Sequence, residues 1–305
     1  MESKISTKDL ILPFFLNTGK NSKEPIESLP GISRLSIDNL IEDIKEVRNL
    51  GINKVLLFGT SKNKDLLGSD AFNENGLVQQ AVRAIKVQFK DIIVITDVCL
   101  CAYTAHGHCG ILKNENEVII DNFNTIKTLA KIALSHARAG ADWVAPSAMA
   151  KKQVLEIRKT LDKNGCYSTK ILGYSAKFCS NFYGPFREAV NSSPKFGDRS
   201  GYQLNFSDAK KAIKEIQEDI KEGADAVMVK PALCYLDIIK EASSKVNLPL
   251  AAYNVSAEYA MVKAYCHSPD LEKKLVLEIL TSIKRAGADL IITYHAKEVA
   301  KWLRV

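Results

Sequence analysis

Three cysteines in one short segment are the residues of this 305-residue sequence that most directly indicate chemistry. The segment Asp97–Gly110, DVCLCAYTAHGHCG, combines three thiols, two imidazoles and a carboxylate at the end of an apolar run. Cys99 and Cys101 would point to the same side of a strand, and two glycines then let the chain turn back to deliver Cys109. Thiolates select zinc, and three protein ligands leave a fourth tetrahedral position open. The spacing therefore predicts a catalytic type of zinc site.

Two other interpretations of this cluster fit the same spacing. His108 could complete a closed structural zinc site, or the three cysteines could be ordinary reduced thiols without a metal. The C-x-C-x7-C pattern does not separate these alternatives, because it is less diagnostic than paired C-x-x-C motifs. The seven cysteines, an odd number in a chain without a recognisable secretory signal, favour reduced thiols over a disulfide framework.

Two lysines end apolar segments that read as strands. Lys177 in GYSAKF and Lys230 in AVMVKP would each bury the aliphatic part of the side chain. A buried lysine is unfavourable unless it is paired or neutral, so an inward-facing lysine is a candidate Schiff-base nucleophile. If both amines share one pocket about 5 Å apart, they repel by roughly 3 kcal/mol at an effective dielectric of about 20, which favours a neutral amine. The alternative is that each lysine pairs with a carboxylate at the rim.

Further polar residues lie where the predicted strands end or in the longest interruption between elements. The strand ends supply Asp97, Ser147, Ser256 and Tyr294. The interruption at Cys179–Ser207 supplies Arg187 and Arg199, with Lys195 nearby, and arginine can grip a carboxylate with two hydrogen bonds. Each arginine alone could be an ordinary surface residue, but next to the two candidate Schiff-base lysines and the thiols they indicate a substrate that carries a carboxylate and a ketone.

The elements that must position these residues alternate regularly along the chain. Eight short β-rich runs are predicted to be strands, at Leu10–Leu16, Lys54–Gly59, Ile92–Asp97, Trp143–Ser147, Lys170–Lys177, Ala226–Lys230, Leu248–Ser256 and Leu290–Tyr294. Segments with 3.6-residue periodicity between them are predicted to be helices, including Ile37–Asn49, Phe123–Ala139, Val154–Asn164, Ala209–Glu222 and Leu271–Ala286. Several helices end in a cation and then a glycine, at Gly51, Gly140, Gly223 and Gly287.

This alternation predicts an α/β fold, a single (β/α)8 TIM barrel rather than a doubly wound sheet. Residues 1–9 form a short N-terminal extension and 10–305 the barrel catalytic domain. The interruption at about 179–207 follows the fifth strand and is predicted to be a lid over the end of the barrel that holds active sites.

Composition and charge exclude several classes of partner. The net charge of +7 is modest and the lysines are spread over helical faces, so no nucleic-acid partner is predicted, only a slight attraction for anionic substrates. No apolar run approaches 18 residues, which predicts no membrane span. The first residues, MESKISTKDLILPFF, lack the pattern of a signal peptide, and we expect a cytoplasmic protein.

Five segments together resemble the signatures of the porphobilinogen synthase, or 5-aminolevulinate dehydratase, family, in that family's order and over nearly the whole chain. They read DVCLCAYTAHGHCG, YSAKFCSNFYGPFREA, SSPKFGDR, GADAVMVKPALCYLDII and GADLIITYHA. The resemblance implies condensation of two 5-aminolevulinate molecules to porphobilinogen with loss of two waters, in tetrapyrrole and haem synthesis.

The same resemblance implies roles for single residues, by position in the matched motifs. Lys230 would bind the first substrate and Lys177 the ketone of the second. The expected contacts are Ser256 and Tyr294 for the first substrate's carboxylate, Asp97 and Ser147 for its amine, and Arg187, Arg199 and Gln203 for the second substrate. The expected ligands of a catalytic zinc are Cys99, Cys101 and Cys109.

Three departures from the family pattern affect the expected properties. Ala148 stands where the family has an acidic residue and Lys151 and Lys152 follow, while Ala257 stands where the family has glycine. Only nine residues precede Leu10, where relatives carry an arm that wraps a neighbouring subunit. We therefore expect a homo-oligomer smaller than the family's octamer, such as a dimer, with weak or absent allosteric regulation by magnesium.

Other functions compete with this one. Ala148 and Ala257 fit a specialised paralogue that uses the two lysines on 5-aminolevulinate or a related amino ketone outside haem synthesis. A weakly active, regulatory zinc-binding protein would not require the lysine pair. A class I aldolase would account for one lysine but not for the three thiols.

Overall fold

Eight parallel strands close into a barrel in the computed structural model, which describes residues 4–114 and 117–304. Neighbouring strands pair in the order β10-β9-β8-β7-β6-β5-β4-β1, and pairing of β1 with β10, Leu10 opposite Ile291, closes the ring. The strands are β1 (Leu10–Leu16), β4 (Lys54–Phe58), β5 (Ile93–Val98), β6 (Trp143–Pro146), β7 (Lys170–Lys177), β8 (Ala226–Lys230), β9 (Leu250–Asn254) and β10 (Leu290–Thr293). The predicted (β/α)8 barrel is confirmed.

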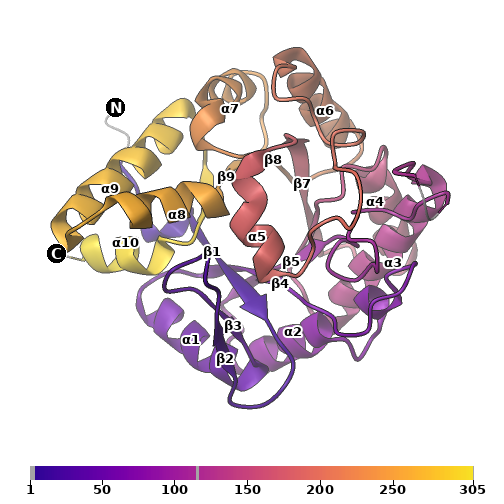
Figure 1. Ribbon diagram of the computed structural model, residues 1–305, viewed down its shortest axis with the longest axis horizontal. Helices are drawn as coiled ribbons and strands as arrows, with labels where there is room; N and C mark the ends of the chain where they lie inside the picture. Colours follow the sequence, from indigo (N-terminus) through magenta and orange to yellow (C-terminus); the bar gives the residue numbers. More distant parts are fainter. Residues whose placement is uncertain (1–3, 115–116, 305) are drawn as a thin grey trace.

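Helices surround the barrel (Figure 1). They are α1 (Ile37–Asn49), α2 (Leu77–Gln88), α3 (Asn122–Ala139), α4 (Gln153–Lys163), α5 (Gly184–Ala189), α6 (Ala209–Lys221), α7 (Leu236–Ser243), α8 (Ser256–Tyr265), α9 (Pro269–Ala286) and α10 (Ala296–Trp302). The 3-10 turns within the described residues are η1 (Thr7–Asp9), η2 (Ser69–Phe72), η3 (Asn181–Tyr183) and η4 (Leu233–Tyr235). In the described part of the chain, no helix has the length and apolar character needed to cross a membrane.

Glycines mark the ends of four of the predicted helices, as expected. Gly51, Gly140, Gly223 and Gly287 have φ angles of 86°, 103°, 101° and 121°, which side chains with a Cβ rarely adopt. Each glycine therefore ends its helix and turns the chain toward the next strand.

Two hydrophobic layers follow from the alternation of side chains along the strands. In β8, Ala226 and Met228 lie in a cluster inside the barrel, whereas Val227 and Val229 pack in the layer between the strands and the helices. The next residue, Lys230, continues the alternation and faces the interior. The core thus brings an amine to the carboxyl end of the strand, where barrel active sites lie.

A β-bulge in β7 turns the second lysine inward as well. The register with β8 shifts by one residue within β7, after which Lys177 pairs directly with Lys230. Ser175 hydrogen-bonds to a carboxylate of α6 and Ala176 packs in the outer layer, so two consecutive residues face outward. Tyr174 and Lys177 can therefore both face the interior although they are three residues apart.

Three features at the carboxyl end of the barrel differ from or extend the sequence expectation. A hairpin of β2 (Lys23–Pro25) and β3 (Ser33–Leu35), which was not predicted, extends the sheet beside β1. The segment 179–207, called the insertion below, contains η3 and α5, and α5 lies across the middle of the barrel (Figure 1). The strand predicted to reach Ser256 was wrong at that end, because β9 stops at Asn254 and Ser256 begins α8.

Candidate active site

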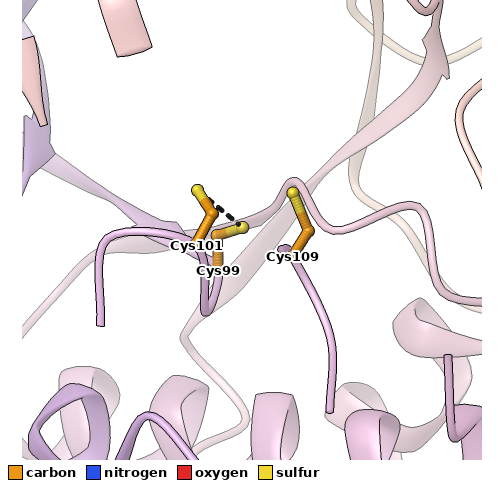
Figure 2. A group of neighbouring side chains, drawn as sticks. All are labelled: Cys99, Cys101 and Cys109. Carbon is orange, nitrogen blue, oxygen red and sulfur yellow. Dashed lines mark hydrogen bonds between the residues drawn. The ribbon is translucent and has the colours of Figure 1, made fainter. Parts of the chain in front are cut away.

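The three cysteines of the Asp97–Gly110 segment form one buried cluster. The sulfurs of Cys99, Cys101 and Cys109 all lie within 4.8 Å of one another, and those of Cys99 and Cys101 are 3.5 Å apart. Figure 2 shows the three side chains gathered around one small volume. Tetrahedral Zn–S bonds of about 2.3 Å separate two sulfur ligands by roughly 3.8 Å. The spacing and soft donor chemistry of the cluster therefore fit a zinc-like metal.

The backbone positions this cluster differently from the sequence expectation. β5 ends at Val98, so Cys99 and Cys101 lie in the turn after the strand and not on one face of it. Gly107 has a φ of 77°, and a Cβ there would lie 2.5 Å from the carbonyl oxygen of Ser193. The turn back toward Cys109 therefore requires glycine at 107, as predicted.

His108 does not join the cluster as a fourth ligand. One ring nitrogen, Nδ1, lies 3.1 Å from the hydroxyl of Tyr202, and Nε2 lies 3.0 Å from the carbonyl oxygen of Phe196. Both partners belong to the insertion, so this histidine connects the cysteine loop to it. In the described residues, the group of potential metal ligands contains only the three cysteines, which favours the open site over the closed one.

The thiols are electrostatically coupled to each other and to the insertion. Hydrogen bonds from Cys101 and Cys99, with help from the Arg199 guanidinium, hold the pKa of the Cys109 thiol well below its ordinary value. Hydrogen bonding to Cys101 and Cys109 and burial instead raise the pKa of Cys99. A metal cation would favour the thiolate form of all three residues.

Both predicted lysines are buried at the carboxyl ends of paired strands. Lys177 is 5% exposed, and its Nζ donates a hydrogen bond of 2.6 Å to the backbone carbonyl of Ser147. Lys230 is 3% exposed. Burial and then the Lys177 ammonium lower the pKa of Lys230 well below its ordinary value.

Four aromatic rings surround the amine of Lys230 and are called the aromatic cage below. The distances from Nζ to the ring centroids are 4.2 Å for Tyr253, 4.8 Å for Phe186, and 5.2 Å for both Tyr174 and Tyr183. Phe186 and Tyr183 come from the insertion, and the other two face into the barrel from β7 and β9. The cage replaces the water around the amine with the apolar surface of the rings. The π faces of the rings can still attract the amine when it is protonated.

Asp97 and Ser147, two of the candidate substrate contacts, lie beside the lysine pair. One carboxylate oxygen of Asp97, Oδ1, is buried without a hydrogen-bond partner in the described structure. Burial raises the pKa of Asp97 to about 6, although Lys177, a hydrogen bond with Ser147 and Lys230 act in the opposite direction. This carboxylate can therefore accept a proton or hold an amine near neutral pH.

The insertion brings three more of the predicted residues toward the cysteine cluster. Arg199 donates hydrogen bonds of 2.7 and 3.1 Å to the carbonyls of Ser192 and Gly107. Buried polar atoms remain without partners in the described chain at Arg187 Nε, Arg199 Nε and both amide atoms of Gln203. Such buried groups are unfavourable unless a ligand satisfies them.

A cavity of about 390 Å³ adjoins this region on the outer side of the cysteine cluster. Cys109, Ala148 and Gln203 line it, whereas neither lysine does. The small side chain of Ala148, one of the departures noted in the sequence, therefore borders open space next to the metal-ligand candidates.

Ser256 and Tyr294 lie next to the aromatic cage, and the hydroxyls of both make hydrogen bonds. Ser256 Oγ donates to the carbonyl of Phe182 and accepts from the backbone N–H of Phe186, each at 3.1 Å. The hydroxyl of Tyr294 lies 3.1 Å from that of Tyr253. Ser256 thus contacts the insertion, and Tyr294 reaches the aromatic cage.

Two groups of residues around the site were missed by the sequence reasoning. The aromatic cage read as ordinary core, although inward alternation along β7 and β9 could have placed Tyr174 and Tyr253 near the strand ends. Glu258, only 2% exposed, accepts hydrogen bonds of 2.8 Å from the backbone N–H groups of Leu233 and Val255. It therefore fixes the loop after Lys230, and no sequence pattern indicated this role.

Comparison with known proteins agrees with this geometry. A family model described as delta-aminolevulinic acid dehydratase matches residues 1–302. Proteins of that name from Archaeoglobus fulgidus and Methanothermus sociabilis are 49% and 51% identical, over 99% and 98% of this chain and 93% and 92% of theirs. The Bacillus subtilis protein of that name is 46% identical, over 99% of this chain and 93% of its own.

A solved structure gives the same result at the level of the fold. The crystal structure of delta-aminolevulinic acid dehydratase (porphobilinogen synthase) from Toxoplasma gondii, in complex with the reaction product porphobilinogen, superimposes with a TM-score of 0.94. It is 42% identical, and the match covers 98% of this chain and 86% of that one. With its barrel, its paired lysines and its three-thiol cluster, this chain belongs to the delta-aminolevulinic acid dehydratase family.

Proposed function

We propose that this protein is a porphobilinogen synthase, a lyase that condenses two molecules of 5-aminolevulinate to porphobilinogen with loss of two waters. The observation that carries the proposal is the register pairing of two buried lysines, Lys177 and Lys230, next to a buried cluster of three thiols. Membership of the family and the names of the relatives support the same reaction.

Lys230 is the proposed nucleophile toward the first substrate. Its lowered pKa makes the neutral amine available to attack the ketone carbon, and loss of the carbonyl oxygen as water leaves an iminium. The iminium withdraws electrons from the neighbouring carbon, so a proton there is removed more easily. Ser256 and Tyr294 are the proposed contacts of the carboxylate of this substrate, and Asp97 and Ser147 those of its amine.

The second substrate is assigned to the side of the site near Cys109, where Arg199 and Gln203 of the insertion lie. Lys177 is the proposed partner of its ketone, through a second Schiff base. Arg187, Arg199 and Gln203 carry buried polar atoms without partners and are the proposed contacts of this substrate, mainly of its carboxylate. The two substrates would then approach each other above the carboxyl ends of the paired strands.

Cys99, Cys101 and Cys109 are the proposed ligands of a zinc ion. When bound, zinc would act as a Lewis acid at its open position, polarising a carbonyl or binding an amine of the substrate. The burial of all three thiols protects them from solvent.

Borohydride trapping with 5-aminolevulinate tests the lysine assignment. We expect reduction to attach substrate covalently to Lys230 in the wild type. In Lys230→Met no substrate should be attached at position 230. The matched control is Lys170→Met, which removes an exposed lysine at the other end of β7 and should change neither trapping nor product formation. Porphobilinogen is measured by its coloured adduct with an aldehyde reagent. Trapped substrate without porphobilinogen would favour a different amino-ketone reaction, and no adduct on either lysine would refute the mechanism.

Metal removal tests the zinc assignment separately. We expect chelation to abolish condensation but to leave Schiff-base trapping, because the nucleophilicity of the lysines does not depend on the metal. Cys109→Ser should no longer bind zinc stoichiometrically and should lack the thiolate-to-metal absorption band that we expect when cadmium is added to the wild type. Cys166→Ser should keep both properties. Retention of stoichiometric zinc in Cys109→Ser would contradict the ligand set.

A cytoplasmic, homo-oligomeric enzyme is the proposed state of the protein. A biosynthetic reaction on a small soluble substrate and reduced thiols are consistent with that compartment. An assembly smaller than an octamer and weak or absent regulation by magnesium stay predictions from the sequence, which sedimentation and a titration of activity with magnesium would measure.

A further inference from the structure

One buried cation of the N-terminal hairpin holds the end of the helix that covers the site. Arg34 on β3 is 8% exposed. Its Nε donates a hydrogen bond of 2.6 Å to the carbonyl of Ala189, and its Nη2 donates one of 2.8 Å to the carbonyl of Glu188. Its third nitrogen, Nη1, pairs with Glu24 at 2.5 Å. The last carbonyls of α5 thus receive a guanidinium, the kind of group that best satisfies a helix C-terminus.

The other end of α5 is fixed around Lys230. The hydroxyl of Tyr183, just before α5, donates toward the carbonyls of Phe178 and Lys230, at 2.9 and 3.0 Å. Phe186 places its ring 4.8 Å from the Lys230 amine, and its backbone N–H bonds to Ser256. The single short helix therefore connects the Arg34 contact with one wall of the aromatic cage.

We propose that Arg34 is a positioning residue that holds α5 over the Schiff-base lysine, so that Phe186 excludes water from the amine. This inference rests on the proposed function, because it assigns Lys230 the role of nucleophile. Arg34 touches no reacting atom, and its effect passes through α5. Nothing in the family motifs quoted above includes this residue, which lies on the hairpin that the sequence reasoning did not predict.

Exclusion of water would appear in the pH profile of the enzyme. The titratable groups that face Lys230 are Lys177 and Tyr174 on β7, Asp97 on β5, Cys99 and Cys101 after β5, Tyr183 before α5, and Tyr253 on β9. Burial is the largest cause of its lowered pKa, ahead of the charges of its neighbours. Loosening α5 admits water and stabilises the ammonium form, so the amine would become neutral only at higher pH.

The test compares kcat/KM for porphobilinogen formation across pH in Arg34→Met, Arg34→Lys and Glu24→Gln. We expect Arg34→Met to move the acidic limb upward by about one pH unit and therefore to lower kcat/KM on that limb on the order of tenfold. The acidic limb of Arg34→Lys should lie between those of Arg34→Met and the wild type, because lysine keeps the charge but not the paired donors. Glu24→Gln is the control and should leave the limb in place, since both carbonyl contacts survive.

A second variant keeps the inference testable if Arg34→Met does not fold. Phe186→Ala opens the cage directly and must move the same limb in the same direction. An unmoved limb in Phe186→Ala or in a folded Arg34→Met, or an equal shift in Glu24→Gln, would overturn the inference. Failure of the wild type to form porphobilinogen would instead refute the proposed function, so the two failures can be told apart.

Discussion

The two lysines of the site occupy equivalent positions on neighbouring strands but differ in their surroundings. The amine of Lys177 donates a hydrogen bond to a backbone carbonyl, whereas that of Lys230 faces four aromatic rings. The ammonium of Lys177 also disfavours a second positive charge nearby. One amine therefore supplies charge and the other is prepared as the nucleophile.

This asymmetry predicts that Lys177 supports the reactivity of Lys230 before any second substrate binds. In Lys177→Met, loss of the neighbouring charge raises the pKa of Lys230, so trapping of the first substrate near pH 7 should slow on the order of tenfold. Trapping at pH 9 should recover toward the wild-type rate. The pH dependence of single-turnover borohydride reduction measures this, and an unchanged pH dependence would contradict the prediction.

At the same scale, residue type limited what the sequence could predict. Thiols and strand-end lysines have few structural uses, so their positions indicated chemistry directly. Tyr253 and Phe186 are equally suitable for a core, and only their distances to the Lys230 amine distinguish a cage from ordinary packing. Partner geometry of this kind is set by tertiary contacts and leaves no pattern in the sequence.

At the scale of elements, the loop after β5 delivers Cys109 through one turn at Gly107. We predict that Gly107→Ala destabilises the protein by at least about 2 kcal/mol, from the strained backbone and the clash with the carbonyl of Ser193. It should also weaken cadmium binding, because Cys109 moves. The measurements are urea unfolding and cadmium titration.

Gly165→Ala is the matched control for this prediction. Gly165 has a similar φ of 75°, but nothing lies within 4 Å of a Cβ placed there. Gly165→Ala should lower the free energy of unfolding by only about 1 kcal/mol and should bind cadmium as tightly as the wild type. Equal effects of the two substitutions would show that the turn does not position the thiol.

Element boundaries were the part of the fold that the sequence predicted least well. The apolar run through Val255 read as strand up to Ser256, yet the structure begins α8 at that serine, where Glu258 accepts the N–H of Val255. The carboxylate of Glu258, three residues after Val255, caps the start of α8, and this cap competes with continuation of the strand. Burial of the carboxylate decides in favour of the helix. The β2–β3 hairpin was missed because its strands are only three residues long.

For the whole molecule, two of the four buried histidines among the described residues, His136 and His295, link stability to pH most strongly. Burial lowers the pKa of His136 to about 3, and burial and then Lys263 lower that of His295 to about 3. Unfolding exposes both rings to water, where they bind protons below about pH 6.5. The unfolded chain then binds more protons than the folded one, so stability falls as the pH drops through 6.5 toward 3.

We predict that His295→Phe removes about half of this histidine contribution. Each histidine accounts for up to about 2 kcal/mol of unfolding free energy lost between pH 7 and pH 5. Phenylalanine can keep the ring contact with Tyr259, whose centroid is 4.4 Å away, without buried nitrogens. Urea unfolding at the two pH values measures the difference. His267→Gln, at an exposed position, should lose as much unfolding free energy between the two pH values as the wild type does. The same loss in His295→Phe as in the wild type would refute the assignment.

The bulge in β7 also bears on how the chain could change over evolutionary time. It absorbs one extra residue between Tyr174 and Lys177, so the lysine is positioned by its pairing with β8 and not by its distance along its own strand. Loss of one residue there would convert the bulge into regular pairing and keep Lys177 opposite Lys230. Deletion of one residue within β8, which has no bulge to absorb it, would turn Lys230 out of the barrel. We therefore expect length variation to be tolerated on one side of the lysine pair and eliminated by selection on the other.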